Sequence, residues 1–273
     1  MPSPVRAPHS ADHRTFVRPV ALLLVLGVLL GAGCSHSTSS MGSASVSPSG
    51  SLSATAPSPD PRVGLRAGRF DAQEATWNLK VLSRTQPSAK FAKEINSDLA
   101  FTGPYAIQGS YSGYQVWDIS TPRHPSLKTA YYCPASQSDV SVYKNLLFVS
   151  GEGLTGRLDC GDEGVKDTVS KERLRGLRMF DITDIANPKN VGNVQTCRGS
   201  HTHTVLVDPK DPDNVYVYIS GSARVRAPNE HAGCSGAASG TYEDAGRFPP
   251  EVLQGAIAHP AEAASSGSAH IRN

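Results

Sequence analysis

Two histidines separated by one residue have the side chains best suited to chemistry in this sequence. His201 and His203 lie in the run Ser200–His203, at the start of an apolar stretch with the pattern of a β-strand. Residues two apart in a strand point to the same side, so both imidazoles would face one surface. Such a pair is compatible with metal binding, and the sequence therefore indicates a candidate ligand site at this strand.

A repeated pattern places two aspartates in register with His201. The run Ser97-Asp98-Leu99 recurs 41 residues later as Ser138-Asp139-Val140, and Ser200-His201-Thr202 forms a third copy. If equivalent strands converge on one axis, four side chains form a ring of ligands for a divalent cation or a polar ligand: Asp98, Asp139, His201 and His203. The alternative, which we favour, is structural, with these side chains hydrogen-bonded to the backbone of neighbouring repeats. Beyond this optional divalent metal ion, no cofactor is predicted.

No catalytic motif accompanies these residues. Gly109–Gly113 has Tyr111 where a nucleophile elbow needs serine, and Gly151–Gly156 lacks the Lys-Ser/Thr of a phosphate loop. Asp208–Asn214 is acidic but lacks the spacing and closing glutamate of a calcium loop, so it predicts a turn. No Ser, His and Asp set stands out as a triad. The sequence therefore leaves enzymatic activity open and favours a protein that is not an enzyme.

Short strands separated by turns fill the chain from Asn96 to Ser220, and its 25 glycines and 20 prolines favour many turns. Asp118–Pro125 recurs as Asp181–Pro188, each preceded by an aromatic residue, and predicts a turn fixed by side-chain hydrogen bonds. Four short strands per repeat are the unit of a β-propeller. The predicted fold is all-β: a partial propeller of about two and a half four-stranded repeats over residues 71–235.

An insertion, Glu152–Arg175, separates the second and third strands of the second repeat. Four arginines lie in or near it: Arg157, Arg173, Arg175 and Arg178. They predict a solvated loop, with anion binding as the alternative.

Four cysteines follow the repeats closely. Cys133 and Cys197 each precede a repeat start, and Cys160 and Cys234 each lie in the loop after that repeat's second strand. Of the three pairings open to four cysteines, this placement favours Cys133–Cys160 and Cys197–Cys234. A zinc site of four thiolates is the alternative, but no Cys-x-x-Cys spacing supports it. Oxidised pairs indicate a location outside the cytoplasm.

The repeats resemble the LVIVD-repeat family, bacterial β-propeller proteins of the cell surface. The matching stretches cover about half of the chain: Asn96–Phe101, Gln115–Ser120, Asp139–Phe148, Gly156–Gly161, Val194–Thr204 and Asn214–Tyr218. The resemblance implies a propeller and an exported location, and it implies no particular reaction.

The repeat pattern stops after about Cys234, and residues 236–273 predict a tail that is disordered or a degenerate blade. A closed propeller needs at least four blades, so the sequence suggests an open array or a truncated product. Open sheet edges favour self-association.

The N-terminus predicts export. Residues 1–34 combine basic residues, the apolar run Val20–Leu30 and a small-residue exit ending at Cys34, which is typical of a secretory signal. Gly31–Cys34 resembles the lipobox of bacterial lipoproteins, although Leu30 stands one place early, so lipidation of Cys34 is predicted and simple secretion is the alternative. Residues 35–70, rich in Ser, Gly, Ala and Pro, predict a flexible tether.

Together these features predict a lipid-anchored protein of the cell envelope. The net charge of +2 indicates no nucleic-acid partner. The favoured function is a surface binding or scaffold module for an unidentified protein or small-molecule ligand. The alternatives are a metal-binding protein or metal-dependent enzyme, and a non-functional truncated paralogue.

Overall fold

The computed structural model describes residues 52–68, 71–234, 251–256 and 259–268, and the contacts divide the chain into the units Met1–Thr55 and Ala56–Asn273. The predicted signal, Cys34 and most of the predicted tether lie outside the described residues. Among the residues that are described, no helix combines the length and apolar character needed to cross a membrane.

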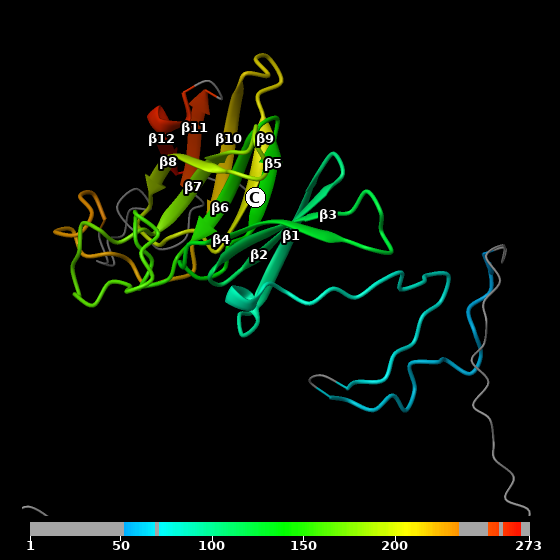
Figure 1. The fold of residues 1–273 in the computed structure, drawn as a ribbon. Coiled ribbons are helices and arrows are strands. Elements are labelled where there is room, and N and C mark those ends of the chain that lie inside the picture. The colour runs from blue at the N-terminus through cyan, green and yellow to red at the C-terminus, as the bar shows by residue number, and fades with distance from the viewer. Residues whose placement is uncertain (1–51, 69–70, 235–250, 257–258, 269–273) are drawn as a thin grey trace, which may run out of the picture. The chain divides into compact units, whose positions relative to one another are not determined.

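The described part of the second unit is built from three four-stranded antiparallel sheets, each an open meander (Figure 1). The first sheet contains β1 (Asn96–Thr102), β2 (Tyr105–Ser110), β3 (Gly113–Asp118) and β4 (Ser126–Tyr132). The second contains β5 (Val140–Tyr143), β6 (Leu146–Gly151), β7 (Gly176–Asp181) and β8 (Lys189–Gln195). The third contains β9 (Thr202–Val207), β10 (Asn214–Ser220), β11 (Glu251–Ala256) and β12 (Ala264–Ser268). The short 3-10 helices η1 (Ala89–Phe91) and η2 (Pro260–Glu262) complete the described elements. The prediction of an all-β protein is confirmed.

Apolar side chains hold successive sheets together face to face. Ile107 and Val116 of the first sheet cluster with Leu147 and Val149 of the second. The other face of β6 carries Leu146 and Phe148, which cluster with β10 and β11 of the third sheet. Because side chains alternate along a strand, the continuous apolar run of β6 fills both faces of the second sheet.

The recurring Asp-Ile-Ser/Thr segments form the same turn in two sheets, as predicted. After β3, the Asp118 carboxylate accepts hydrogen bonds from the Ser120 backbone N–H at 2.9 Å and from its hydroxyl at 2.6 Å. After β7, Asp181 accepts the equivalent bonds from Thr183 at 2.8 and 2.6 Å. These side-chain bonds replace backbone pairing where the chain leaves the sheet.

The third sheet is more complete than the sequence predicted. The sequence predicted a disordered tail or a degenerate blade after Cys234, whereas β11 pairs with β10 over Asn214–Ile219 and Glu251–Ala256, and β12 adds a fourth strand. The apolar signal in β11 is short, only Val252 and Leu253, because β10 supplies the pairing edge and the packing surface. A local pattern of two apolar residues does not reveal such a strand.

Candidate functional site

The two histidines predicted to share one surface point to different partners. His201 lies before β9 begins, and its Nδ1 is 2.6 Å from Glu152 Oε1 and 3.1 Å from Ser222 Oγ. The His203 side chain is fully buried between the second and third sheets, with its ring beside that of Phe148. The alternation rule fails because His201 is outside the strand to which it was applied.

His203 sits in a small polar cluster inside the sheet interface. Its Nδ1 lies 2.8 Å from Ser150 Oγ and 3.1 Å from Asp139 Oδ2, and Ser150 Oγ is 2.7 Å from Ser200 Oγ. The serine and the aspartate therefore meet the same ring nitrogen. A catalytic relay needs them on opposite nitrogens, and His203 Nε2 is buried without a hydrogen-bond partner. This geometry supports packing of the sheets and does not activate Ser150.

The two predicted aspartates join each sheet to the next one along the chain. Asp98 Oδ2 accepts a hydrogen bond from the Val140 backbone N–H at 3.0 Å, and Asp139 Oδ2 accepts one from the His203 backbone N–H at 2.8 Å. Strand pairing sets Val140 opposite Val149 and His203 opposite Ile219, so His203 is the structural equivalent of Val140. The predicted alignment of His201 with the aspartates was therefore wrong by one residue.

Hydrogen bonding in this interface favours the ionised form of the Asp139 carboxylate. Burial is the largest single influence and raises the pKa of Asp139. Hydrogen bonds from the His203 side chain and backbone, the charge of the His203 ring and a hydrogen bond with the Asp98 side chain together outweigh burial and hold the pKa below its ordinary value. Within the described residues, no group of three or more His, Cys, Asp or Glu side chains is arranged to hold a metal ion. The four predicted ligands instead bond to backbone, hydroxyl and carboxylate partners of this chain.

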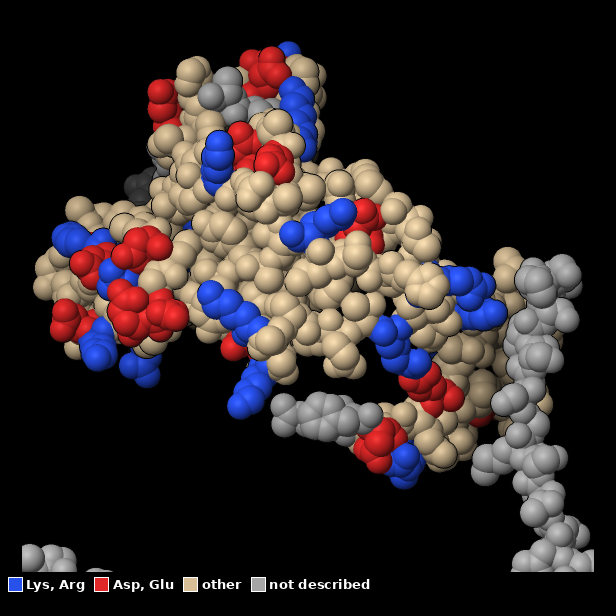
Figure 2. Space-filling view, in the orientation of Figure 1, with Lys and Arg blue, Asp and Glu red and all other residues tan. Residues whose placement is uncertain are grey.

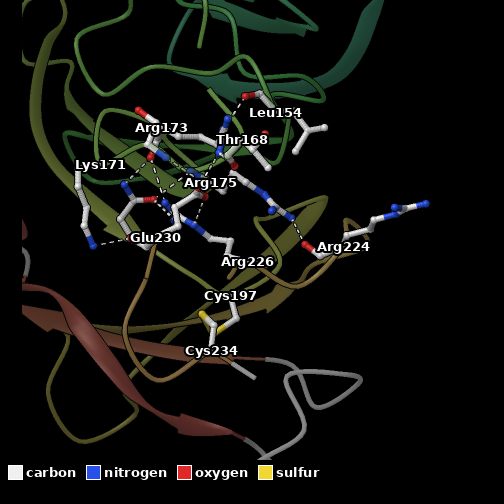
Figure 3. A network of polar contacts seen from close by, with 12 residues as sticks. Leu154, Thr168, Lys171, Arg173, Arg175, Cys197, Arg224, Arg226, Glu230 and Cys234 are labelled. Carbon is white, nitrogen blue, oxygen red and sulfur yellow. Dashed lines mark hydrogen bonds and ion pairs between the residues drawn. A yellow bond between two sulfur atoms is a disulfide. The ribbon is translucent and has the colours of Figure 1, made fainter. Parts of the chain in front are cut away.

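A second cluster, which the sequence did not reveal, is built around one buried glutamate (Figure 3). Glu230 forms an ion pair with Arg173 through Oε2 and accepts a hydrogen bond from Arg226 Nε at 2.8 Å through Oε1. All three side chains are at most 5% exposed. Glu230 also accepts the Ser170 backbone N–H at 3.1 Å, and its own backbone carbonyl accepts Lys171 Nζ at 2.8 Å.

Two further arginines, Arg175 and Arg178, are buried and donate hydrogen bonds to backbone carbonyls. Arg175 Nη2 donates to the Arg224 carbonyl at 2.5 Å, and Arg178 Nη2 donates to the Arg157 carbonyl at 2.6 Å. Burial lowers the pKa of each of Arg175 and Arg178 to about 10, so both remain cationic at neutral pH. The predicted solvated loop is wrong for Arg173, Arg175 and Arg178, whose guanidinium groups bind loop backbone in the interior.

Disulfides fix the two loops that carry this cluster. Cys133, just after β4, is bonded to Cys160, and Cys197, just after β8, is bonded to Cys234, which confirms the predicted pairing. We call residues 152–175 and 221–234 the loop platform. Each disulfide ties one of these loops to the end of a strand, and Glu230 in the second loop binds Ser170 and Arg173 in the first, which joins the two loops to each other.

The surface of the loop platform carries charges of both signs. Arg157 pairs with Asp159 at 2.6 Å and with Glu172 at 2.8 Å, and both carboxylates are largely exposed. Figure 2 shows acidic and basic side chains interspersed over these loops, at the left of the view. A mixed surface of this kind offers paired hydrogen-bonding groups and no single-sign field.

A hollow of about 790 Å³ lies near the opposite end of the second and third sheets, at the β5–β6 turn. Two of its acidic residues stabilise the turns that line it. Asp211 Oδ1 accepts the Asp213 backbone N–H at 3.0 Å, and Asp213 forms an ion pair with Lys144 of the β5–β6 turn at 2.6 Å. Asp208 likewise accepts the Lys210 backbone N–H at 2.8 Å. The prediction of a turn over Asp208–Asn214 is confirmed.

Comparison with known proteins adds no assignment. No protein-family model matches the chain, and no curated protein matches it.

Proposed function

We propose that the chain is an exported, lipid-anchored β-propeller repeat protein of the LVIVD type that acts as a surface binding or scaffold module. Three features support this proposal: the predicted signal ending at Cys34, the two disulfides and the three sheets joined by a recurring contact. The disulfides suit an oxidising compartment outside the cytoplasm. In this proposal the sheets are blades and the loop platform lies at one end of them.

The observation that carries the binding role is the construction of the loop platform. Long loops are ordinarily the most mobile part of a fold, and ordering one costs conformational entropy. Here two long loops are tied by disulfides and by the buried Glu230 carboxylate between Arg173 and Arg226. A rigid, exposed surface held in this way loses little further entropy on binding, which favours recognition of a partner.

The polar cluster at His203 favours binding over catalysis. Ser150 and Asp139 approach the same imidazole nitrogen, and His201 is engaged with Glu152. The side chains that would serve an enzyme or a metal site thus hold sheets and loops together.

Two measurements test the proposal. Expressed with its own leader in a bacterial host, the protein should fractionate with membranes and carry a lipid mass, and Cys34→Ala should release it into the soluble extracytoplasmic fraction. Cytoplasmic retention of the unmodified chain would refute export.

The released protein should then bind isolated cell envelopes saturably, and Glu230→Gln, which loosens the loop platform, should weaken that binding. Retention that does not saturate, or that is equal for both proteins, would refute a binding role for these loops.

A further inference from the structure

The two outermost faces of the three-sheet array carry apolar side chains that no other sheet of the described residues covers. On the first sheet, Leu99 and Phe101 of β1 are 53% and 62% exposed. On the third sheet, Leu206 of β9 and Tyr218 of β10 are 48% and 37% exposed. Isolated apolar residues on a surface are ordinary, but these occupy special positions in the repeat.

The positions in β1 that are exposed on the first sheet have equivalents in β5 and β9, and those equivalents are packed against a neighbouring sheet. Leu99 and Phe101 pair with Gln108 and Ala106 in β2, as Val140 and Val142 pair with Val149 and Leu147 in β6. Val140 is 4% exposed and packs against the first sheet together with Val142. In the third sheet the same positions are held by His203 and Val205, which pack against the second sheet. The first sheet thus presents a face that elsewhere receives the preceding sheet.

The exposed positions on the third sheet belong to the complementary face. By the same register, Tyr218 corresponds to Phe148 and Leu206 to Tyr143, both of which pack between the second and third sheets. Thr202 corresponds to Asp139, whose carboxylate holds the next sheet through a backbone N–H. The third sheet therefore ends in a face that elsewhere receives the following sheet.

We infer that the third sheet of one copy packs on the first sheet of a second copy, and the reverse, in a closed head-to-tail dimer. This contact continues the interface that already joins the sheets inside the chain. It takes the sheets to be propeller blades, as in the proposed function. Propellers contain 4 to 8 blades, so two copies of three sheets form a ring within this range, whereas one copy or three copies do not. Closure uses each face once per copy and leaves none exposed.

The surroundings of β1 suit this packing. The segment before β1 covers only the outer part of that face: the Ser88 backbone N–H donates to Gln115 Oε1 at 2.9 Å, and Phe91 packs edge-on against Tyr132. At the inner strand a hollow of about 270 Å³ lies open beside Asn96 and Leu99. Sheets inside the chain meet through their inner strands, as the Asp98–Val140 and Asp139–His203 bonds show, and also through their third strands, where Phe180 of β7 packs edge-on against Tyr114 of β3. The dimer contact is therefore formed by the inner half of this face, β1 and β2, and the segment before β1 occupies the outer half.

Sedimentation of the exported full chain carrying Cys34→Ala, which excludes the lipid, tests the inference. The oxidised protein should show twice the protomer mass at micromolar concentration. Phe101→Asp and Leu206→Lys should each raise the dissociation constant by at least about tenfold, because each places an unpaired charge in the interface. Leu154→Asp is the matched control, since Leu154 is also 62% exposed but lies in the loop platform, and it should leave the mass unchanged. Circular dichroism should show that all three variants are folded.

A mixture of the two variants separates the head-to-tail arrangement from other dimers. In a head-to-tail ring, one copy carries Phe101→Asp on its first sheet and the other carries Leu206→Lys on its third sheet. These two mutated sheets meet at one interface, where the introduced charges are opposite, and the other interface is formed by two unmodified sheets. The mixture should therefore regain the dimer mass. A monomeric unmodified protein, a dimer that survives either single substitution, an open-ended polymer or a mixture that stays monomeric would each overturn the inference. The sedimentation mass reports assembly alone, so this test can fail without refuting export or ligand binding.

Discussion

Replacing Glu230 by glutamine should destabilise the protein more than any other single-carboxylate change in the loop platform. The carboxylate lies between Arg173 and Arg226, and each of the three side chains is almost completely buried. Removing the charge leaves two guanidinium groups buried without their counter-ion, which typically costs about 3–5 kcal/mol. Glutamine keeps the size of the side chain and can still accept one hydrogen bond, so we expect about 3 kcal/mol, at the lower end of that range.

Urea unfolding at neutral pH measures this difference, with Glu172→Gln as the control. Glu172 lies in the same loop and pairs with Arg157, but its side chain is 67% exposed, so its replacement should leave the unfolding midpoint nearly unchanged. Equal midpoints for Glu230→Gln and the unmodified protein would refute the account of a buried charge that holds the loops together.

The dependence of stability on pH provides a second test of the Glu230→Gln substitution. Burial alone raises the pKa of Glu230, but the Ser170 backbone N–H, the hydrogen bond from Arg226 and the charges of both arginines together hold the pKa below its ordinary value of 4.5. A lowered folded-state pKa contributes stability above the unfolded-state pKa, and this contribution is lost as pH falls through the folded-state value. The unmodified protein should therefore lose stability on acidification more steeply than Glu230→Gln. Parallel pH profiles would contradict the reasoning.

Three further predictions concern the sheets and loops. Cys197→Ser opens a loop with a sequence separation of 37 residues and should lower stability by about 4 kcal/mol, measured by unfolding without reductant; an unchanged midpoint would mean that the bond contributes nothing. Asp139→Ala removes the acceptor of a bond between the second and third sheets and should cost about 1–3 kcal/mol, whereas the exposed Asp162→Ala should be neutral in the same unfolding assay. Because the pKa of Asp139 is lowered in the folded protein, its contribution should begin to fall below about pH 4, the ordinary pKa of aspartate, and should be lost as pH falls through the folded-state pKa; a contribution that does not change with acidification would be evidence against an ionised contact. Gly109→Ala would set a Cβ 2.1 Å from the Ser138 carbonyl oxygen and should lower the thermal midpoint by several degrees, and an unaltered midpoint would show that the first and second sheets are not in contact there.

The strands that the sequence predicted correctly are those whose local pattern matches their surroundings. The run Leu146–Val149 in β6 is apolar throughout because both faces of the strand are buried, and such a run is recognisable without any partner. β11 was missed because its existence depends on β10, which provides pairing and a packing surface for Val252 and Leu253. Tertiary context of this kind does not appear in a short window of sequence.

In the candidate site, too, some features could be predicted from the sequence and others could not. The pairing of Cys133 with Cys160 followed from the repeat, because equivalent positions in repeats have equivalent neighbours. The relation between His201 and His203 was predicted wrongly, because β9 begins at Thr202 and the alternation of side chains along a strand does not extend to His201. The burial of Arg173 against Glu230 left no local signal, since the two residues are separated by 57 positions and neither loop has a regular period.

Limited proteolysis combined with intact-mass spectrometry, on oxidised protein produced with its own leader, tests the central claim most directly. The account predicts a resistant core that retains residues 152–175 and 221–234 uncut, with both disulfides present and a lipid mass on Cys34. Early cleavage within either loop of the oxidised protein, or free thiols at Cys197 and Cys234, would contradict the proposal that these loops form one rigid extracytoplasmic platform.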